Sequence, residues 1–261
     1  MDKRIYLDYT ATTPLASEVY ASMLECFNST YGNASSLHSF GRDASEKLES
    51  SRAIIAKAIN AKPSEVYFTS GGTESNNWAI MGLAHANKSK GKHIIVSAFE
   101  HHSVMEPVSK LETQGFEVTY VPITKKGMVN YKELVKAIRP DTILISVMTV
   151  NNEVGTIQPI KAISKLAKSF GILFHTDCVQ ALGSVRIDVQ DMDIDALSIS
   201  AHKIYGPKGI GALYIKDGVR IEKFMYGGEQ ERNLRAGTSD VPSAVGFAKA
   251  TELLITHFND R

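Results

Sequence analysis

The chain has 261 residues, with 29 Lys and Arg against 28 Asp and Glu, which gives a formal net charge of +1 at pH 7. Hydrophobic residues make up 43% and charged residues 22%; this is a globular composition and excludes intrinsic disorder. The near-neutral charge argues against nucleic-acid binding through bulk charge, and a count of two cysteines excludes a disulfide scaffold.

The length predicts one large domain or two small ones. Two cysteines in so long a chain favour a reducing compartment. The first residues lack the apolar core of a signal peptide, and no stretch approaches the roughly 18 apolar residues that span a membrane. We therefore expect a cytoplasmic protein without membrane contact.

Short apolar runs rich in β-branched residues alternate with longer stretches of helical period. Strands are expected at 66–69, 93–97, 117–121, 142–148, 172–175, 196–200 and 211–215. Helices are expected at 43–60, 73–88, 103–114, 131–138, 160–169 and 241–258. Asp240 is the expected N-cap of the last helix. The alternation predicts an α/β fold with a mostly parallel sheet flanked by helices.

A lysine and an acid each follow an expected strand. Lys203 comes after strand 196–200, and the carboxyl ends of strands are where α/β sheets bind ligands. A lysine of lowered pKa is a nucleophile that can form a Schiff base, although a surface lysine in a loop is the alternative. Asp177 ends the apolar segment 172–177, and its carboxylate could hold a protonated ring nitrogen or simply cap a helix.

The segment 70–76 (SGGTESN) joins a strand to a helix. Its small residues let main-chain N–H groups approach an anion, and the helix N-terminus adds partial positive charge. The segment lacks both the GK[ST] of an ATP-binding loop and the GxGxxG of a dinucleotide site. It therefore indicates a phosphate cradle, with an ordinary capped turn as the alternative.

His101, after strand 93–97, could stack on a flat ring or move a proton. His101 and His102 are not accompanied by other residues at metal-ligand spacing, so we predict no metal site. Asn152, after strand 142–148, could donate a hydrogen bond to a ring substituent or lie in a plain turn. Because these groups follow successive strands, they should gather at one edge of the sheet and form a pyridoxal phosphate (PLP) site.

Five segments spread over the chain carry a family resemblance: 6–14 (YLDYTATTP), 32–36 (GNASS), 68–75 (FTSGGTES), 150–155 (VNNEVG) and 200–211 (SAHKIYGPKGIG). They resemble the NifS/IscS-type cysteine desulfurases, which are fold-type I PLP enzymes of the class V aminotransferase group. The resemblance implies an aspartate-aminotransferase-like PLP-transferase fold. Residues 1–15 would belong to the small domain and residues 16–261 to the PLP-binding large domain.

The resemblance also implies residue roles. Lys203 would bond covalently to PLP and later carry protons, and His101 would stack on the ring and assist proton transfer. Asp177 would pair with the pyridine nitrogen and Gln180 with the phenolic oxygen, while Asn152 would contact the ring oxygen or the substrate carboxylate. The phosphate would be held by Gly72, Thr73, Ser200 and His202, and by Thr238 of the neighbouring subunit in a homodimer.

The implied activity converts L-cysteine to L-alanine. Sulfur would pass through an enzyme persulfide to an acceptor such as an iron–sulfur scaffold or a tRNA-thiolation enzyme, without direct contact with nucleic acid. The resemblance places the persulfide cysteine and most of the small domain beyond residue 261, so we expect a chain truncated at its C-terminus. Cys26, in a stretch of helical pattern, is expected to be a buried apolar residue; Cys178 is a less favoured candidate for the persulfide. The alternatives are a related class V lyase or aminotransferase, such as a selenocysteine lyase, and a PLP-binding remnant without turnover.

Overall fold

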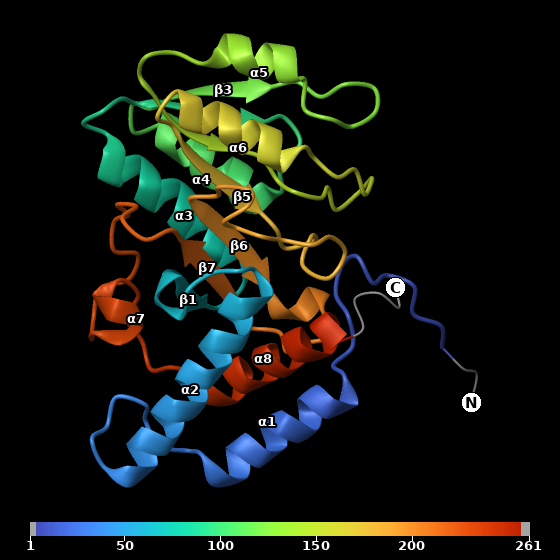
Figure 1. Cartoon of the computed structure of the whole chain (residues 1–261), viewed down its shortest axis with the longest axis vertical. Coiled ribbons are helices and arrows are strands. Elements are labelled where there is room, and N and C mark those ends of the chain that lie inside the picture. The colour runs from blue at the N-terminus through green and yellow to red at the C-terminus, as the bar shows by residue number, and fades with distance from the viewer. Residues whose placement is uncertain (1–3, 257–261) are drawn as a thin grey trace.

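The apolar runs form one seven-stranded sheet in the computed structural model, which describes residues 4–256 (Figure 1). The strands are β1 (Val66–Thr69), β2 (His93–Ser97), β3 (Glu117–Val121), β4 (Thr142–Ser146), β5 (Leu173–Asp177), β6 (Ala196–Ser200) and β7 (Gly211–Ile215). Their order is β1-β7-β6-β5-β4-β2-β3, and only β7 runs antiparallel to its neighbours. The predicted α/β fold with a mostly parallel sheet is confirmed.

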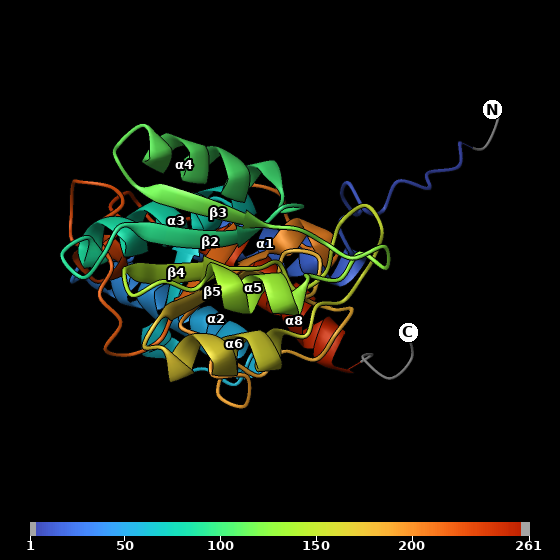
Figure 2. The ribbon, with the colours of Figure 1, turned by 90° about the horizontal axis from the view of Figure 1, so that it is seen from above.

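Helices cover both faces of this sheet. They are α1 (Ser17–Ser29), α2 (Ser39–Ala58), α3 (Gly72–Asn87), α4 (His102–Glu112), α5 (Tyr131–Ala137), α6 (Ile160–Ser169) and α8 (Val241–Thr256); the short turn α7 (Gln230–Asn233) contains non-helical residues. Figure 2 shows α3 and α4 on one side of the strands and α6 on the other. None of the helices in residues 4–256 is long and apolar enough to cross a membrane.

Neighbouring residues of one strand supply two different cores. Ile94 and Val96 of β2 belong to a cluster with apolar residues of α3 and α4, whereas Ile95 belongs to a second cluster that extends through residues of α6 to those of α2 and α8. Successive side chains of a strand point to opposite faces of the sheet, so a strand covered on both faces must be apolar throughout. This explains why the strands were recognisable as continuous apolar runs.

Five of the seven strands and helix α6 have the predicted bounds, and the other boundaries within the described residues differ from the predictions by at most four residues. Helix α2 begins four residues early, because the His38 side chain accepts a hydrogen bond from the Gly41 N–H and caps it. Strand β4 ends at Ser146, and the N–H of Met148 donates to the Glu100 side chain instead of to a strand. Helix α1 was missing from the expected helices, although the residues around Cys26 had a helical pattern.

The N-cap of α8 follows the prediction, since the carboxylate of Asp240 accepts a hydrogen bond from the Ser243 N–H at 3.0 Å. The expected end of this helix, residues 257–258, lies outside the described residues. In Figure 1, α1, α2 and α8 pack together at one end of the molecule, and α5 lies at the other.

Candidate active site

A cavity of about 460 Å³ lies at the carboxyl ends of the central parallel strands. It is lined by eight of the ten predicted site residues, namely Gly72, Thr73, His101, Asn152, Asp177, Gln180, His202 and Lys203. Ser200 lines an adjoining hollow that shares Gly72, Thr73 and His202 with the cavity. Thr238 lines a separate hollow. The structure thus brings nine of the ten residues together and leaves Thr238 apart.

Lys203 reaches this cavity from the short 3₁₀ turn that follows β6. Its Nζ donates hydrogen bonds to the carbonyl oxygens of Thr10 and of Ala11, the latter at 2.9 Å. Burial lowers the pKa of the Lys203 amine, and the nearby carboxylates of Asp177 and Asp8 oppose this only in part. A tethered amine of lowered pKa is suited to act as a nucleophile.

The N-terminal segment is fastened to the lysine loop by main-chain and side-chain hydrogen bonds. The carbonyl oxygen of His202 accepts from both the N–H and the hydroxyl of Thr13, at 3.0 and 2.9 Å. The Thr13 hydroxyl oxygen in turn accepts from the N–H of Tyr205. The carbonyls that hold Lys203 are therefore fixed relative to the turn that carries it.

Asp177, the last residue of β5, is a buried carboxylate in the cavity wall. It accepts hydrogen bonds from the Val179 N–H at 2.8 Å and from the Asn76 amide at 2.7 Å. Burial raises the pKa of this carboxyl although both hydrogen bonds lower it. Neither donor carries a charge, so a cationic ring nitrogen in the cavity would stabilise the ionised form.

The turn between β1 and α3 has the backbone of a phosphate cradle. Gly71 has φ +150° and ψ −176°, a conformation essentially limited to glycine. A Cβ at Gly72 would lie 2.5 Å from Val179 Cγ2, so only glycine fits there without displacement. The adjoining hollow of about 350 Å³ lies at the N-terminus of the 16-residue helix α3 and is also lined by Ser200, His202 and Lys208. These donors and this helix end fit a phosphate group.

An ion pair stabilises the same turn. The Glu74 carboxylate accepts from the Ser70 N–H at 2.9 Å and from the Arg235 guanidinium at 2.8 and 3.1 Å. Burial alone would raise the pKa of Glu74, but these hydrogen bonds outweigh it and lower the pKa. The turn is thereby linked to the segment that carries Thr238.

The remaining predicted residues are held by neighbours in the cavity wall. His101 is the N-cap of α4, with its Nδ1 accepting from the Ser103 N–H at 3.1 Å. Asn152 donates to the Glu153 carboxylate, and Gln180 donates to the Thr10 carbonyl at 2.9 Å. Within residues 4–256, no three His, Cys, Asp or Glu side chains gather as they would around a metal ion.

Sequence reasoning missed Asn76 and Ser103, which join the predicted residues by hydrogen bonds. A signal for Asn76 was present, because it lies four residues after Gly72 and thus on the same face of α3 as the turn. Ser103 had no such signal, since its part depends on how α3 and α4 pack together.

The sequence profile of the class-V aminotransferases matches residues 5–260. The chain belongs to the class-V aminotransferase family. Members of this family are PLP enzymes, which agrees with the cradle, buried acid and lysine of the cavity.

Relatives within this family carry more specific names. The chain is 54% identical over 255 residues to "Cysteine desulfurase IscS" of Dictyoglomus turgidum, covering 98% of the chain and 65% of the relative. It is 54% identical to the IscS of Methanosarcina thermophila, covering 97% and 62%. A solved NifS-like protein superposes with a TM-score of 0.97 at 39% identity, covering 99% of this chain and 71% of that one. The chain spans less than two thirds of the length of the two curated relatives.

The two cysteines of this class-V chain are both buried, and neither forms a disulfide. Cys178 Sγ lies 3.0 Å from Thr149 Oγ1, and burial raises the pKa of its thiol to about 12. Burial also raises the pKa of the Cys26 thiol. Because the thiolate is the reactive form, the structure argues against the less favoured hypothesis that Cys178 carries a persulfide.

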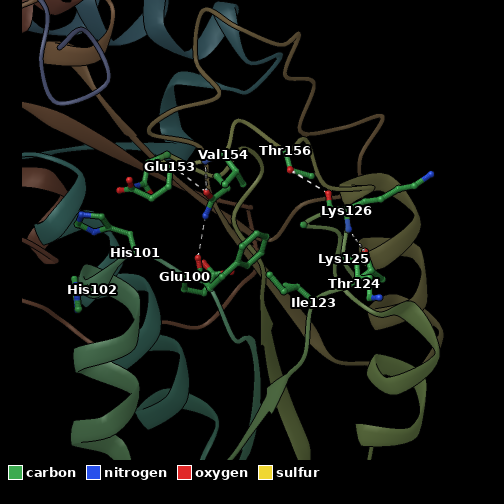
Figure 3. Close-up of a pocket in the computed structure, with 14 residues that line it drawn as sticks. Glu100, His101, His102, Ile123, Thr124, Lys125, Lys126, Glu153, Val154 and Thr156 are labelled. Carbon is green, nitrogen blue, oxygen red and sulfur yellow. Dashed lines mark hydrogen bonds between the residues drawn. The ribbon is translucent and has the colours of Figure 1, made fainter. Parts of the chain in front are cut away.

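A second hollow, of about 710 Å³, adjoins the active-site cavity and shares His101, Asn152 and Glu153 with it. In Figure 3, His101 and Glu153 lie on one side of this hollow, and Lys125 and Lys126 lie on the other. The His101 ring points away from the two lysines (Figure 3).

Proposed function

We propose that this chain is the PLP-binding catalytic part of a cysteine desulfurase, which converts L-cysteine to L-alanine and passes the sulfur to an acceptor. The observation that carries the proposal is the convergence of Lys203, Asp177, His101 and the glycine turn on one cavity. The IscS and NifS-like relatives support it, as does a solved relative described as "SspA in complex with cysteine", 43% identical over 95% of this chain.

The residues present fit PLP at both ends of the cavity. Gly72, Thr73, Ser200 and His202 would hold the phosphate, since they line the hollow at the start of α3. Asp177 would accept a hydrogen bond from the ring nitrogen and keep it protonated. Gln180 would bind the phenolic oxygen, and Asn152 the ring oxygen or the substrate carboxylate. Each of these roles applies to the protein with PLP bound.

When bound, PLP supplies an electron sink for the Cα of an attached amino acid. Lys203 would bond to the cofactor through its Nζ and would afterwards take up and return a proton at that atom. The burial that lowers the Lys203 pKa increases the uncharged, nucleophilic fraction of the amine. His101 would cover the ring and move a second proton. Asp177 would keep its negative charge through a cationic ring nitrogen, helped by the two hydrogen bonds, because burial on its own raises the pKa of its carboxyl.

A homodimer would complete the phosphate site through Thr238 of the second subunit. An outward stripe on α1, consisting of Tyr20, Leu24 and Phe27, supports an interface because these side chains are 58%, 45% and 59% exposed. Their spacing places them on one face of the helix. The two free thiols fit a reducing compartment such as the cytoplasm.

The thiol that takes the substrate sulfur is, in this proposal, neither Cys26 nor Cys178, because both are buried and have raised pKa values. The sulfur acceptor would be an iron–sulfur scaffold or a tRNA-thiolation enzyme. The alternative functions are a related class V lyase acting on selenocysteine and a PLP-binding remnant without turnover. Alanine release from L-cysteine and from L-selenocysteine, compared on the same preparation with an added small thiol as acceptor, distinguishes these three.

The first experiment is reduction with borohydride after addition of PLP, followed by peptide mapping. We expect a phosphopyridoxyl group on Lys203, no adduct in Lys203→Ala, and an unchanged adduct in Lys165→Ala, which alters an exposed lysine of α6. A folded chain that carries no adduct on Lys203 in excess PLP would contradict the proposed function.

A further inference from the structure

A chain of buried polar side chains links His101 to Asp177 beneath the cavity. His101 Nδ1 lies 2.7 Å from Ser103 Oγ, and Asn76 Nδ2 lies 2.8 Å from the same Oγ. Asn76 Nδ2 also lies 2.7 Å from Asp177 Oδ2. Asn76 is fully buried, and Ser103 and Asp177 are 7% and 4% exposed. The bridge therefore spans from α4 through α3 to the end of β5.

The donors and acceptors of this bridge can be assigned from chemistry alone. An ionised carboxylate only accepts hydrogen bonds, so the Asn76 amide nitrogen must face Asp177. The second hydrogen of that nitrogen points to Ser103 Oγ. The main-chain N–H of Ser103 donates to His101 Nδ1 at 3.1 Å, which makes Nδ1 an acceptor, so the Ser103 hydroxyl must donate to it as well. Two donors on Nδ1 require that the proton of the neutral imidazole sits on Nε2.

One polar atom of the bridge has no hydrogen-bond partner, and it supports the same orientation of the Asn76 amide. Asn76 Oδ1 is buried and has no hydrogen-bond partner among the described residues. Burying an amide oxygen without a hydrogen-bond partner costs free energy, so the hydrogen bonds of the Asn76 amide nitrogen must outweigh this cost. The gain is the charge-assisted hydrogen bond to Asp177, which the reversed amide would lose.

We propose that Asn76 and Ser103 are positioning residues that hold His101 as the Nε2–H tautomer, with the charge of Asp177 setting the direction of the whole bridge. This inference rests on the proposed function for the use made of His101, but the tautomer itself is a property of the chain without cofactor. The bridge would prepare the imidazole to donate from Nε2 before any substrate arrives. It would also connect Asp177, which is assigned to the ring nitrogen, with His101, which is assigned to proton transfer.

The test is the ¹⁵N spectrum of the histidine rings in the cofactor-free chain, at a pH where His101 is neutral. His101→Gln identifies the signals of His101. We expect a pyridine-type shift for Nδ1 and a pyrrole-type shift for Nε2. Ser103→Ala should move both shifts towards a mixture of tautomers, and Ser103→Thr, which keeps the hydroxyl, should restore them. The control is Ser164→Ala, which removes another buried hydroxyl, one that donates to the main-chain carbonyl of Asp193. It should leave the His101 shifts unchanged.

Asn76→Leu tests the direction of the bridge, because it removes the amide that donates to Ser103 Oγ and keeps a side chain of similar size. Ser103 Oγ can then accept from Nδ1–H instead, and the Nδ1 shift should move towards the pyrrole type. A pyrrole-type Nδ1 in the unaltered chain would overturn the proposal. Identical shifts in folded Ser103→Ala and in the unaltered chain would also overturn it.

The loaded enzyme provides the second readout. With an added small thiol as sulfur acceptor, Ser103→Ala should lower kcat for alanine formation about tenfold, the equivalent of one hydrogen bond, at unchanged KM, and Ser103→Thr should recover it. Failure of the unaltered chain to bind PLP would contradict the proposed function while leaving the tautomer result standing. Shifts that respond as expected with an unchanged kcat would overturn the positioning role.

Discussion

Arg52 of α2 and Glu231 of α7, 179 residues apart in the chain, form a buried two-point ion pair. Nη1 lies 2.7 Å from Oε2 and Nη2 lies 2.9 Å from Oε1, while the same carboxylate accepts from the Phe68 N–H at 2.9 Å. The pair holds Glu231, Arg232 and Asn233 in left-handed backbone conformations, with φ of 44°, 55° and 63°. Three such residues in a row are unfavourable without support from their surroundings.

We expect Glu231→Gln to destabilise the fold by up to about 3–5 kcal/mol, because it removes the buried counter-charge of Arg52 and leaves only the exposed carboxylate of Glu49. Chemical denaturation measures the change. Asp191→Asn is the matched control, since it breaks an exposed ion pair with Lys161 and should cost less than ~1 kcal/mol. Equal effects of the two substitutions would show that the buried pair does not hold the left-handed turn.

Gly71→Ala should reduce both stability and PLP affinity. At φ +150° an alanine is strained by about 1–2 kcal/mol, and relief of that strain would distort the turn that faces the phosphate hollow. Gly171→Ala is the control, because Gly171 has φ +70° with no atom near its would-be Cβ. Fluorescence titration with PLP should show at least a tenfold weaker affinity for Gly71→Ala only. If both variants bound PLP like the unaltered chain, the turn would not be the phosphate cradle.

Glu100 should make the fold less stable as the pH rises. Burial raises the pKa of its carboxyl from 4.5 to about 8; hydrogen bonds from Ser97 and Met148 oppose the rise, and Asp177 adds to it. Between these pH values the folded chain keeps a proton that the unfolded chain has lost, so the free energy of unfolding falls as the pH increases. The loss is fully developed above pH 8 and reaches at most ~5 kcal/mol.

Glu100→Gln keeps the shape without the ionisable group and should flatten this dependence. The free energy of unfolding of Glu100→Gln, relative to that of the unaltered chain, should increase from pH 5 to pH 8 in denaturation curves. Glu106→Gln, on the exposed side of α4, should follow the unaltered chain. A Glu100→Gln curve parallel to that of the unaltered chain would mean that Glu100 ionises normally in the fold.

The buried thiols should resist alkylation in the folded chain. With a pKa of about 12, the thiolate fraction of Cys178 at pH 8 is about one part in ten thousand. Mass spectrometry after iodoacetamide should find Cys26 and Cys178 unmodified in the native state and both modified in denaturant. A persulfide on Cys178 after incubation with PLP and L-cysteine would contradict its exclusion as sulfur carrier.

The sequence predicted the sheet and most of the site for one physical reason. Strands buried on both faces must be apolar, and parallel strands bring their carboxyl ends to one edge, so Asp177 and Lys203 could be assigned to a common cavity. The contact of Arg52 with Glu231 and that of Asn76 with Ser103 could not be predicted in this way. Each depends on how two helices or loops distant in sequence pack, and a polar residue within a helix has no periodic signal for its partner.

The outward stripe of α1 should be the surface that pairs two copies of the chain. Leu24→Asp and Phe27→Asp each place a charge on an apolar helix face and should convert a dimer to a monomer in light scattering after gel filtration. Val135→Asp is the control, because Val135 is 40% exposed on α5, at the opposite end of the molecule (Figure 1). Since Thr238 of a second subunit is assigned to the phosphate, the monomeric variants should also bind PLP more weakly. If both α1 variants remained dimers, the interface would lie on another surface. If a monomeric variant bound PLP with full affinity, Thr238 of a second subunit would not be part of the phosphate site.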